Sequence, residues 1–146
     1  MIVSDVMVKN PVKVSPDTLI REVARLMRDR SIASVIIVED DKPLGIITER
    51  DLVRRVLASD GSPDTLKASD SCTRPVVTTF QTASVDSAVG IMNSYDIRRL
   101  VVVDEKNGNV VGILTTDDLW RNFRELSEEL AVNIMALVRS KARALT

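Results

Sequence analysis

The chain has 146 residues, of which 45% are hydrophobic and 28% charged, and 20 basic against 21 acidic residues give a formal net charge of −1. This length predicts about one core, and the near-neutral charge argues against a general nucleic-acid binder. The absence of histidine and the single cysteine exclude the commonest general base, an internal disulfide and the usual structural zinc sites.

The first half predicts the element order β-α-β-β-α. A short extended segment containing Pro11-Val12 comes first, and a helix follows over about 18–30, with Asp17 or Thr18 as its N-cap. The helix is indicated by apolar residues at i, i+3, i+4 and i+7, namely Ile20, Val23, Ala24 and Met27. The remaining elements are strands at 34–39 and 44–48, separated by a turn at 40–43, and a second helix at 49–58.

The second half predicts the same order after a turn-rich linker around 59–64. Pro75-Val76 marks its extended segment, and a helix is expected over about 83–95, capped by Thr82 or Ser84. Strands follow at 99–104 and 109–115 around Asn107-Gly108, a strong hairpin signal, and the last helix of the pattern starts at 116.

The two halves are copies of one sequence pattern. The motif Gly-x-x-Thr-x-x-Asp occurs twice, and each of its three residues recurs 67 positions later (45 to 112, 48 to 115 and 51 to 118). We therefore expect repeats at 1–59 and 68–123, a linker at 60–67 and a helical extension at 124–146. Halves of this size form marginal cores alone, so we expect one globule of mixed α/β (α+β) class, with pseudo-twofold symmetry and two related clefts between the repeats.

The C-terminal extension predicts a long amphipathic helix, broken near Ser127. Trp120, the only tryptophan, lies near its start, and no Gly or Pro occurs from there to Arg143. The apolar side consists of Leu119, Phe123, Leu126, Leu130, Ile134 and Leu137, and the polar side of Arg121, Arg124, Glu125, Glu128 and Arg139. The helix packs on its own chain or forms a dimer contact, and we favour the dimer.

The repeated Thr-x-x-Asp has two interpretations. It is a capping box, in which Thr48 or Thr115 starts a helix and Asp51 or Asp118 reaches back to it. It also suits a ligand, because a first-turn carboxylate can accept hydrogen bonds from both hydroxyls of a ribose and a helix N-terminus favours a phosphate. Arg50 favours the ligand, since a cation there opposes the helix dipole unless an anion is bound; an ion pair with Glu49 or another acid is the alternative.

The doubled motif and the repeated β-α-β-β-α order resemble the CBS-domain pair, or Bateman module. The resemblance covers about residues 1–123 and includes the Asp5-Val6-Met7 opening and the run from Ile97 to Asp104. It implies clefts that bind AMP, ADP, ATP, or in some members S-adenosylmethionine or NAD, and a module that regulates an attached or partner protein.

The resemblance also implies site residues. Asp51 and Asp118 correspond to the family's ribose-binding aspartate, and Thr48 and Thr115 to its helix-starting hydroxyl. Arg98 and Arg99 correspond to basic residues that reach phosphates, and they occur only in the second repeat, where the first has Ala33 and Ser34. The strands that contact adenine contain Lys13, Val14 and Thr79. With Arg50 near one site and Asp117 near the other, we expect tighter phosphate binding around Asp51.

Several residues also have an interpretation that involves no ligand. Lys13, Arg98 and Arg99 suit solvated strand ends, Arg54 and Arg55 a solvated helix face, and Cys72 a small buried hydrophobe at the position of Met7.

The function we expect is a non-catalytic sensor of adenosine-containing ligands that has no metal, forms a homodimer and acts on a separate effector protein. The alternatives are a structural or oligomerisation module with vestigial clefts, or a sensor of S-adenosylmethionine or NAD. No nucleophile–base pair or Walker-type loop supports an enzyme. With no apolar run near the ~18 residues of a membrane span and no signal-peptide pattern, we expect a cytoplasmic protein that binds no membrane.

Overall fold

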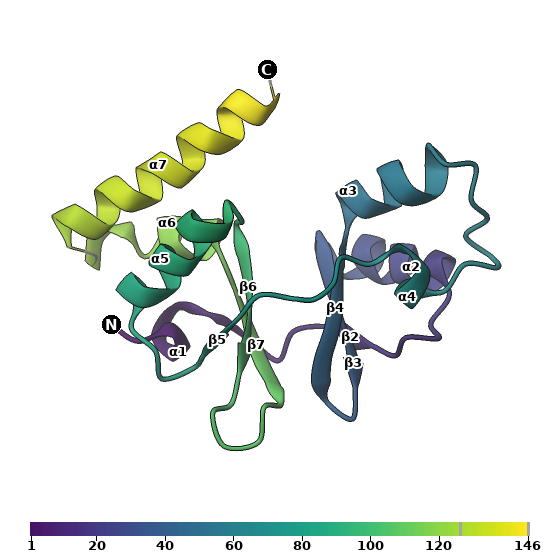
Figure 1. The fold of residues 1–146 in the computed structure, drawn as a ribbon, viewed down its shortest axis with the longest axis horizontal. Coiled ribbons are helices and arrows are strands. Elements are labelled where there is room, and N and C mark those ends of the chain that lie inside the picture. The colour runs from purple at the N-terminus through teal and green to yellow at the C-terminus, as the bar shows by residue number, and fades with distance from the viewer. Residues whose placement is uncertain (126, 146) are drawn as a thin grey trace. The chain divides into compact units, whose positions relative to one another are not determined.

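The computed structural model describes residues 1–125 and 127–145, and the chain divides into two compact units (Figure 1). Unit 1 contains Met1–Asn10 and Val77–Thr146, and unit 2 contains Pro11–Val76. Each unit has a sheet and a buried apolar cluster of its own. Both are mixed α/β, so the predicted fold class is confirmed.

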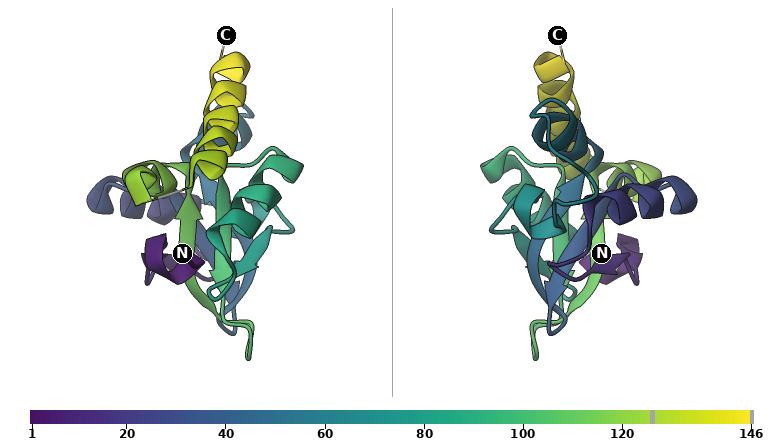
Figure 2. Two further views of the ribbon diagram at one scale, coloured as in Figure 1. Left: turned by 90° about the vertical axis from the view of Figure 1, so that its left-hand side faces the viewer. Right: turned by 90° about the vertical axis from the view of Figure 1, so that its right-hand side faces the viewer.

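Unit 2 has a three-stranded sheet in the order β2-β3-β4. β2 pairs with β3 in parallel, and β3 pairs with β4 antiparallel, with Ser34 opposite Thr48. Helices cover the sheet face that carries the apolar cluster (Figures 1 and 2). The elements are β2 (Lys13–Val14), α2 (Ile20–Arg30), β3 (Ser34–Glu39), β4 (Lys42–Thr48), α3 (Glu49–Asp51), η1 (Leu52–Leu57) and α4 (Ala68–Ser71).

Unit 1 has a four-stranded sheet in the order β1-β7-β6-β5. β5 and β6 are parallel, whereas β6 and β7, and β7 and β1, are antiparallel. The elements are α1 (Val3–Val6), β1 (Val8–Lys9), β5 (Thr78–Phe80), α5 (Val85–Tyr95), β6 (Arg99–Val103), β7 (Val110–Thr115), α6 (Thr116–Arg121), η2 (Phe123–Glu125) and α7 (Glu128–Leu145).

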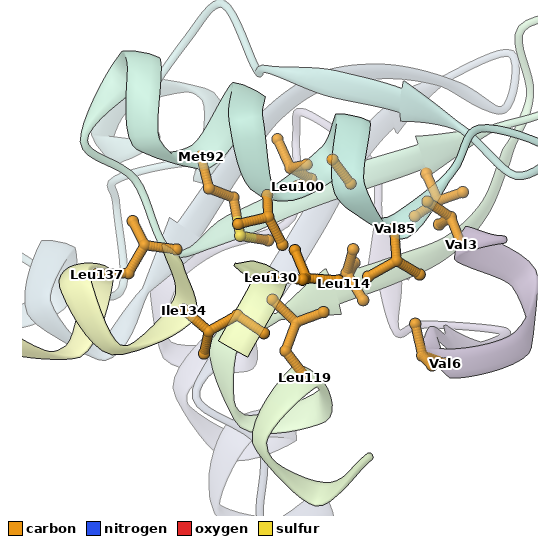
Figure 3. Close-up of a cluster of buried hydrophobic side chains, with 13 residues drawn as sticks. Val3, Val6, Val85, Met92, Leu100, Leu114, Leu119, Leu130, Ile134 and Leu137 are labelled. Atoms are coloured by element: carbon orange, nitrogen blue, oxygen red, sulfur yellow. The ribbon is translucent and has the colours of Figure 1, made fainter. Parts of the chain in front are cut away.

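The core of unit 1 joins side chains from its helices and from the central strands β6 and β7. Figure 3 shows them converging on one cluster, to which α7 contributes three residues that are at most 4% exposed. The apolar side predicted for the C-terminal helix is therefore confirmed at Leu130, Ile134 and Leu137, whereas Leu126 lies outside the described residues.

The opening segment of each repeat completes the sheet of the other repeat. Val8 pairs with Ile113 of β7, and Thr73 pairs with Ile46 of β4 through backbone hydrogen bonds of 2.8 and 3.1 Å. The compact units therefore differ from the expected boundaries at 59 and 68, because the segments 1–10 and 67–76 find their hydrogen-bond partners across the repeat boundary.

The helix caps and the first hairpin turn agree with the sequence-based predictions only in part. Ser84 caps α5 as one of the two expected residues, accepting a hydrogen bond from Ser87 N–H at 3.0 Å. α2 instead starts after Leu19 with no side-chain cap, so the expected Asp17 and Thr18 caps were wrong. The first hairpin turn is shorter than predicted: Asp40 and Asp41 both have positive φ, as a two-residue type I′ turn requires.

Two helices are wound differently from the expectation. The helix predicted at 49–58 has one turn of α-helix and then the π-helix η1, whereas its counterpart α6 is α-helical. The C-terminal helix does not continue from Trp120, because α6 ends at Arg121 and the 3-10 turn η2 precedes α7. The predicted break near Ser127 thus falls just before α7.

Candidate functional site

Asp51 and Thr48 form a reciprocal capping box at the end of β4. Asp51 Oδ2 accepts hydrogen bonds from the Thr48 backbone N–H at 2.9 Å and from the Thr48 hydroxyl at 3.2 Å. The Asp51 N–H donates back to Thr48 Oγ1 at 3.3 Å. The aspartate is only 9% exposed although it is charged, so the strand end and the first helical turn fix its carboxylate in one orientation.

Asp118 and Thr115 repeat this arrangement in unit 1. Asp118 Oδ2 accepts from Thr115 N–H at 2.8 Å and from the Thr115 hydroxyl at 3.0 Å, and Asp118 is 2% exposed. Its other oxygen, Oδ1, is paired with the Arg121 guanidinium. The structure thus brings together each Thr–Asp pair that the repeat predicted, and the capping interpretation is confirmed for both pairs.

Two other acids of the chain cap helices without being buried. Asp5 Oδ2 accepts from Ile2 N–H at 2.9 Å, and Asp70 Oδ2 accepts from Lys67 N–H at 2.8 Å, yet both aspartates are exposed. Capping a short helix therefore does not require burial of the acid. Burying Asp51 and Asp118 removes water from their carboxylates at a cost in free energy, and capping a helix does not require that cost.

Arg98 and Arg99 lie at the same end of the sheet as Asp118. The Arg98 carbonyl accepts a hydrogen bond from Thr116 N–H at 3.1 Å, and Arg99 is the register partner of Thr115. Both arginines are half-buried. In unit 2 the equivalent contacts involve Ala33 and Ser34, so unit 1 alone has a basic pair beside its Thr–Asp box.

Arg50 and Arg55 are the basic residues that follow the box in unit 2. Arg50 is exposed and forms no ion pair with the residues that the structure describes, so the expected alternative with Glu49 is not observed. Arg55 is exposed, as expected for a solvated helix face, and it also donates to the Cys72 carbonyl at 2.7 Å, with its Nε 3.7 Å from Asp51 Oδ1. This contact was not predicted, because it joins residues 17 positions apart and no local motif indicates it.

The three predicted strand residues lie in different environments. Lys13 Nζ pairs with Asp41 Oδ1 at 2.7 Å, at the hairpin turn rather than at the Thr48 end of the sheet. The Val14 side chain is 8% exposed and belongs to the core of unit 2, and Thr79 is 6% exposed in the middle of β5. The structure therefore does not bring the Lys13 ammonium to the Thr48–Asp51 box.

Cys72 packs as the predicted small hydrophobe. It is 8% exposed within the core of unit 2, and burial raises the pKa of its thiol, opposed in part by the charge of Arg74. Its Sγ lies 2.7 Å from the position that a Cβ on Gly45 would take, and the Met7 sulfur lies 2.5 Å from the corresponding position at Gly112.

The profile of the CBS domain matches the chain twice, at residues 3–58 and 68–119. The chain belongs to the CBS domain family. The tandem arrangement confirms the resemblance on which the predicted site residues rest, and the 67-residue step between the two boxes is the step between two CBS domains.

The CBS chain is similar to proteins from several archaea. It is 44% identical to the uncharacterized protein MK0525 of Methanopyrus kandleri over 106 residues, which cover 72% of this chain and 54% of that one. This CBS pair thus spans little more than half of that relative. Among the CBS relatives, the one from Thermoplasma acidophilum that is named inosine-5'-monophosphate dehydrogenase is 33% identical, with 22% of its length covered.

Solved CBS structures share the fold. The CBS domain pair of protein MJ0100, in complex with 5'-methylthioadenosine and S-adenosyl-L-methionine, has a TM-score of 0.75 at 31% identity and covers 84% of this chain and 99% of its own. The CBS domain protein PAE2072 from Pyrobaculum aerophilum, complexed with AMP, has a TM-score of 0.76 at 25% identity and covers 93% and 99%.

The described part of this CBS chain contains neither a cluster of metal ligands nor a helix that could span a membrane. Within residues 1–125 and 127–145, no three Cys, Asp or Glu side chains gather as a metal site would require. No helix in that part is long and apolar enough to cross a membrane.

Proposed function

We propose that this CBS pair is a non-catalytic regulatory module that senses adenosine-containing ligands, with AMP, ADP or ATP as the first candidates. The observation that carries the proposal is the pair of buried capping carboxylates, Asp51 and Asp118, each fixed at the end of a sheet by its own threonine. A buried, oriented carboxylate at the same place in two units suits the recognition of a ribose diol, whose two hydroxyls would otherwise lose hydrogen bonds.

The surrounding residues are assigned to the rest of the ligand. Arg50 directly precedes Asp51 in unit 2, and Arg98 and Arg99 lie beside the Thr115 end of the sheet in unit 1; we assign these cations to the ligand's phosphates. The β2 and β5 backbones, at Val14 and Thr79, are assigned to the adenine. Tighter phosphate binding is expected around Asp51, because the turn after Thr115 carries Asp117 instead of an arginine.

The relatives support an adenosine-containing ligand without choosing among its forms. PAE2072 is complexed with AMP, and MJ0100 with 5'-methylthioadenosine and S-adenosyl-L-methionine. S-adenosylmethionine is therefore an alternative ligand, and NAD is a further alternative that the family resemblance implies. A module with a vestigial site is the second candidate function, and the pairing of Asp118 with Arg121 favours it for unit 1 only.

Regulation requires a readout. We propose that ligand binding shifts the population of two packing states of the CBS pair, that the chain acts as a homodimer, and that a separate effector protein reads the change. A ligand shifts such an equilibrium only through its different affinity for the two states, so binding and the change of state are measurable separately.

A thermal-shift screen tests the proposal. The purified chain is heated with AMP, ADP, ATP, S-adenosylmethionine and NAD, and with inosine monophosphate as a control that keeps the ribose and phosphate but changes the base. At least one adenosine compound is expected to raise the Tm in a concentration-dependent way. A Tm that stays the same with all five compounds, at concentrations up to several millimolar, would overturn the proposal.

A further inference from the structure

The helix α7 presents apolar side chains on two sides. Its buried side contacts the core of unit 1, as described above, and its last turns extend beyond α5 (Figures 1 and 2). On the side away from that core, Val132, Met135 and Val138 are 57%, 41% and 45% exposed. A helix that only packs on its own chain is expected to be polar on its outer side, so this second apolar side needs an explanation.

Four outward residues of α7 form a regular row, which we call the α7 seam: Glu128, Val132, Met135 and Arg139. Their spacing of four, three and four residues is that of the a and d positions of a coiled-coil seam. All four are exposed, and neither Glu128 nor Arg139 has an ion-pair partner among the residues that the structure describes. The seam therefore has an acid at one end, a base at the other and two apolar residues between them.

We propose that the α7 seam binds the same seam of a second copy of this chain, with the two helices antiparallel. In this register Glu128 lies opposite the partner's Arg139, and Val132 lies opposite the partner's Met135. Each contact occurs twice about a twofold axis, so the surface is complementary to itself, as an isologous dimer requires. The proposal rests on the homodimer of the proposed function and names its surface.

The charges select the orientation. A parallel pair would put Glu128 beside the partner's Glu128 and Arg139 beside the partner's Arg139, and like charges repel. An acid near the N-terminus and a base near the C-terminus also match the dipole of a single helix, so the charges alone would not indicate a dimer. The exposed Val132 and Met135 between them are the part that the dipole does not explain.

A groove beside the seam extends the apolar surface. It has a volume of about 220 Å³ between α6 and α7, and Thr116, Asp117, Trp120 and Val138 line it. Trp120 is 53% exposed, and its ring contacts that of Phe123 at a centroid distance of 5.0 Å, with the two planes tilted by 40°. The α7 seam and the groove beside it are smaller than a standard interface of about 1,600 Å². We therefore expect a concentration-dependent dimer with a dissociation constant of about 1–100 µM.

Sedimentation equilibrium of the full chain tests the seam by charge reversal. The 16.1 kDa chain is expected to double in mass with rising concentration. Glu128→Arg is expected to weaken the dimer at least tenfold by opposing the partner's Arg139, Arg139→Glu is expected to do the same, and the double variant is expected to recover most of the loss. Met135→Glu is expected to abolish dimerisation, and circular dichroism checks that each variant folds.

A matched control is Glu105→Arg, which makes the same charge change at an exposed position of the β6–β7 turn and should leave the dimer unchanged. A dimer that persists in all seam variants would overturn the seam and leave the homodimer standing on another surface. A monomer at every concentration would overturn both. Neither result affects the ligand-sensing proposal, which the thermal-shift screen decides separately.

Discussion

Arg121 forms an ion pair with Oδ1 of Asp118 across one turn of α6, and the side chain of Asp118 is only 3% exposed. The corresponding carboxylate in unit 2, Asp51, keeps a looser contact, because Arg55 Nε lies 3.7 Å away and Arg55 also donates to the Cys72 carbonyl. Arg55 therefore retains a partner when Asp51 accepts a ligand, whereas Arg121 would lose the one ion-pair partner it has among the described residues. The two boxes are alike in their caps and different in their counter-charges.

Replacing Arg121 is expected to strengthen ligand binding in unit 1. Arg121→Ala frees Asp118 Oδ1 for a ribose hydroxyl, and the gain should be about two- to fivefold, because the arginine of this pair is 67% exposed and such pairs are weak. Calorimetric titration with AMP in an Asp51→Asn background measures the affinity of the unit 1 site only, because the substitution removes the carboxylate of the unit 2 site.

The control for this variant is Arg54→Ala in an Asp118→Asn background, read at the unit 2 site. Arg54 occupies the equivalent position of the first repeat but forms no ion pair with Asp51 in the described structure. Its removal should leave the affinity unchanged. Weaker binding after Arg121→Ala would show that this arginine holds the ligand rather than competing with it.

Gly112 is expected to tolerate no side chain. A Cβ there would lie 2.5 Å from Met7 Sδ and 2.9 Å from the Val8 carbonyl oxygen, because β1 is the antiparallel neighbour of β7 and Lys9 lies opposite Gly112. Gly112→Ala should lower the free energy of unfolding by about 1–3 kcal/mol. Urea denaturation measures the change.

Gly90 provides the opposite case for the same measurement. It lies exposed inside α5, and a Cβ at this position would meet no heavy atom within 4 Å. Gly90→Ala should raise the free energy of unfolding by about 0.5–1 kcal/mol, because alanine loses less backbone entropy in a helix. Equal effects at Gly112 and Gly90 would be inconsistent with the close approach of Met7 and Val8 to Gly112.

Cys72 is expected to react slowly with thiol reagents. Burial raises the pKa of its thiol, so at a given pH between 7 and 9 the reactive thiolate fraction is smaller than for an ordinary cysteine, and it increases only at higher pH. The rate of alkylation should rise on adding urea to unfold the chain. A fast reaction in the native protein at pH 7 would contradict the burial of the sulfur.

Much of the fold was predictable because the sequence pattern occurs twice, so that each copy supports the elements predicted for the other. Each Thr-x-x-Asp box is a local structure, determined by residues three apart, so the capping partners of Asp51 and Asp118 followed from the spacing alone. The strands at 34–39 and 99–103 also lie where their apolar runs indicated.

The remaining features depend on contacts between distant segments. The pairing of Val8 with Ile113 joins residues more than a hundred positions apart, and the sequence of neither strand indicates which strand it pairs with. Arg55 donates to the Cys72 carbonyl 17 positions further along the chain, and no local pattern indicates that contact. η1 is π-helical, and a helical sequence pattern does not distinguish π from α winding. The Lys13–Asp41 pair likewise depends on where the hairpin turn meets β2.

Calorimetric titration of the chain with AMP and with S-adenosylmethionine tests the central claim most directly. The wild-type chain should bind at least one of them, and Asp51→Asn should weaken binding at least tenfold. Asp70→Asn, which removes an exposed capping acid of the same unit, should not. Binding that is equally strong in Asp51→Asn and the wild type, or no heat with either ligand, would contradict the assignment of the buried carboxylates to an adenosine ribose.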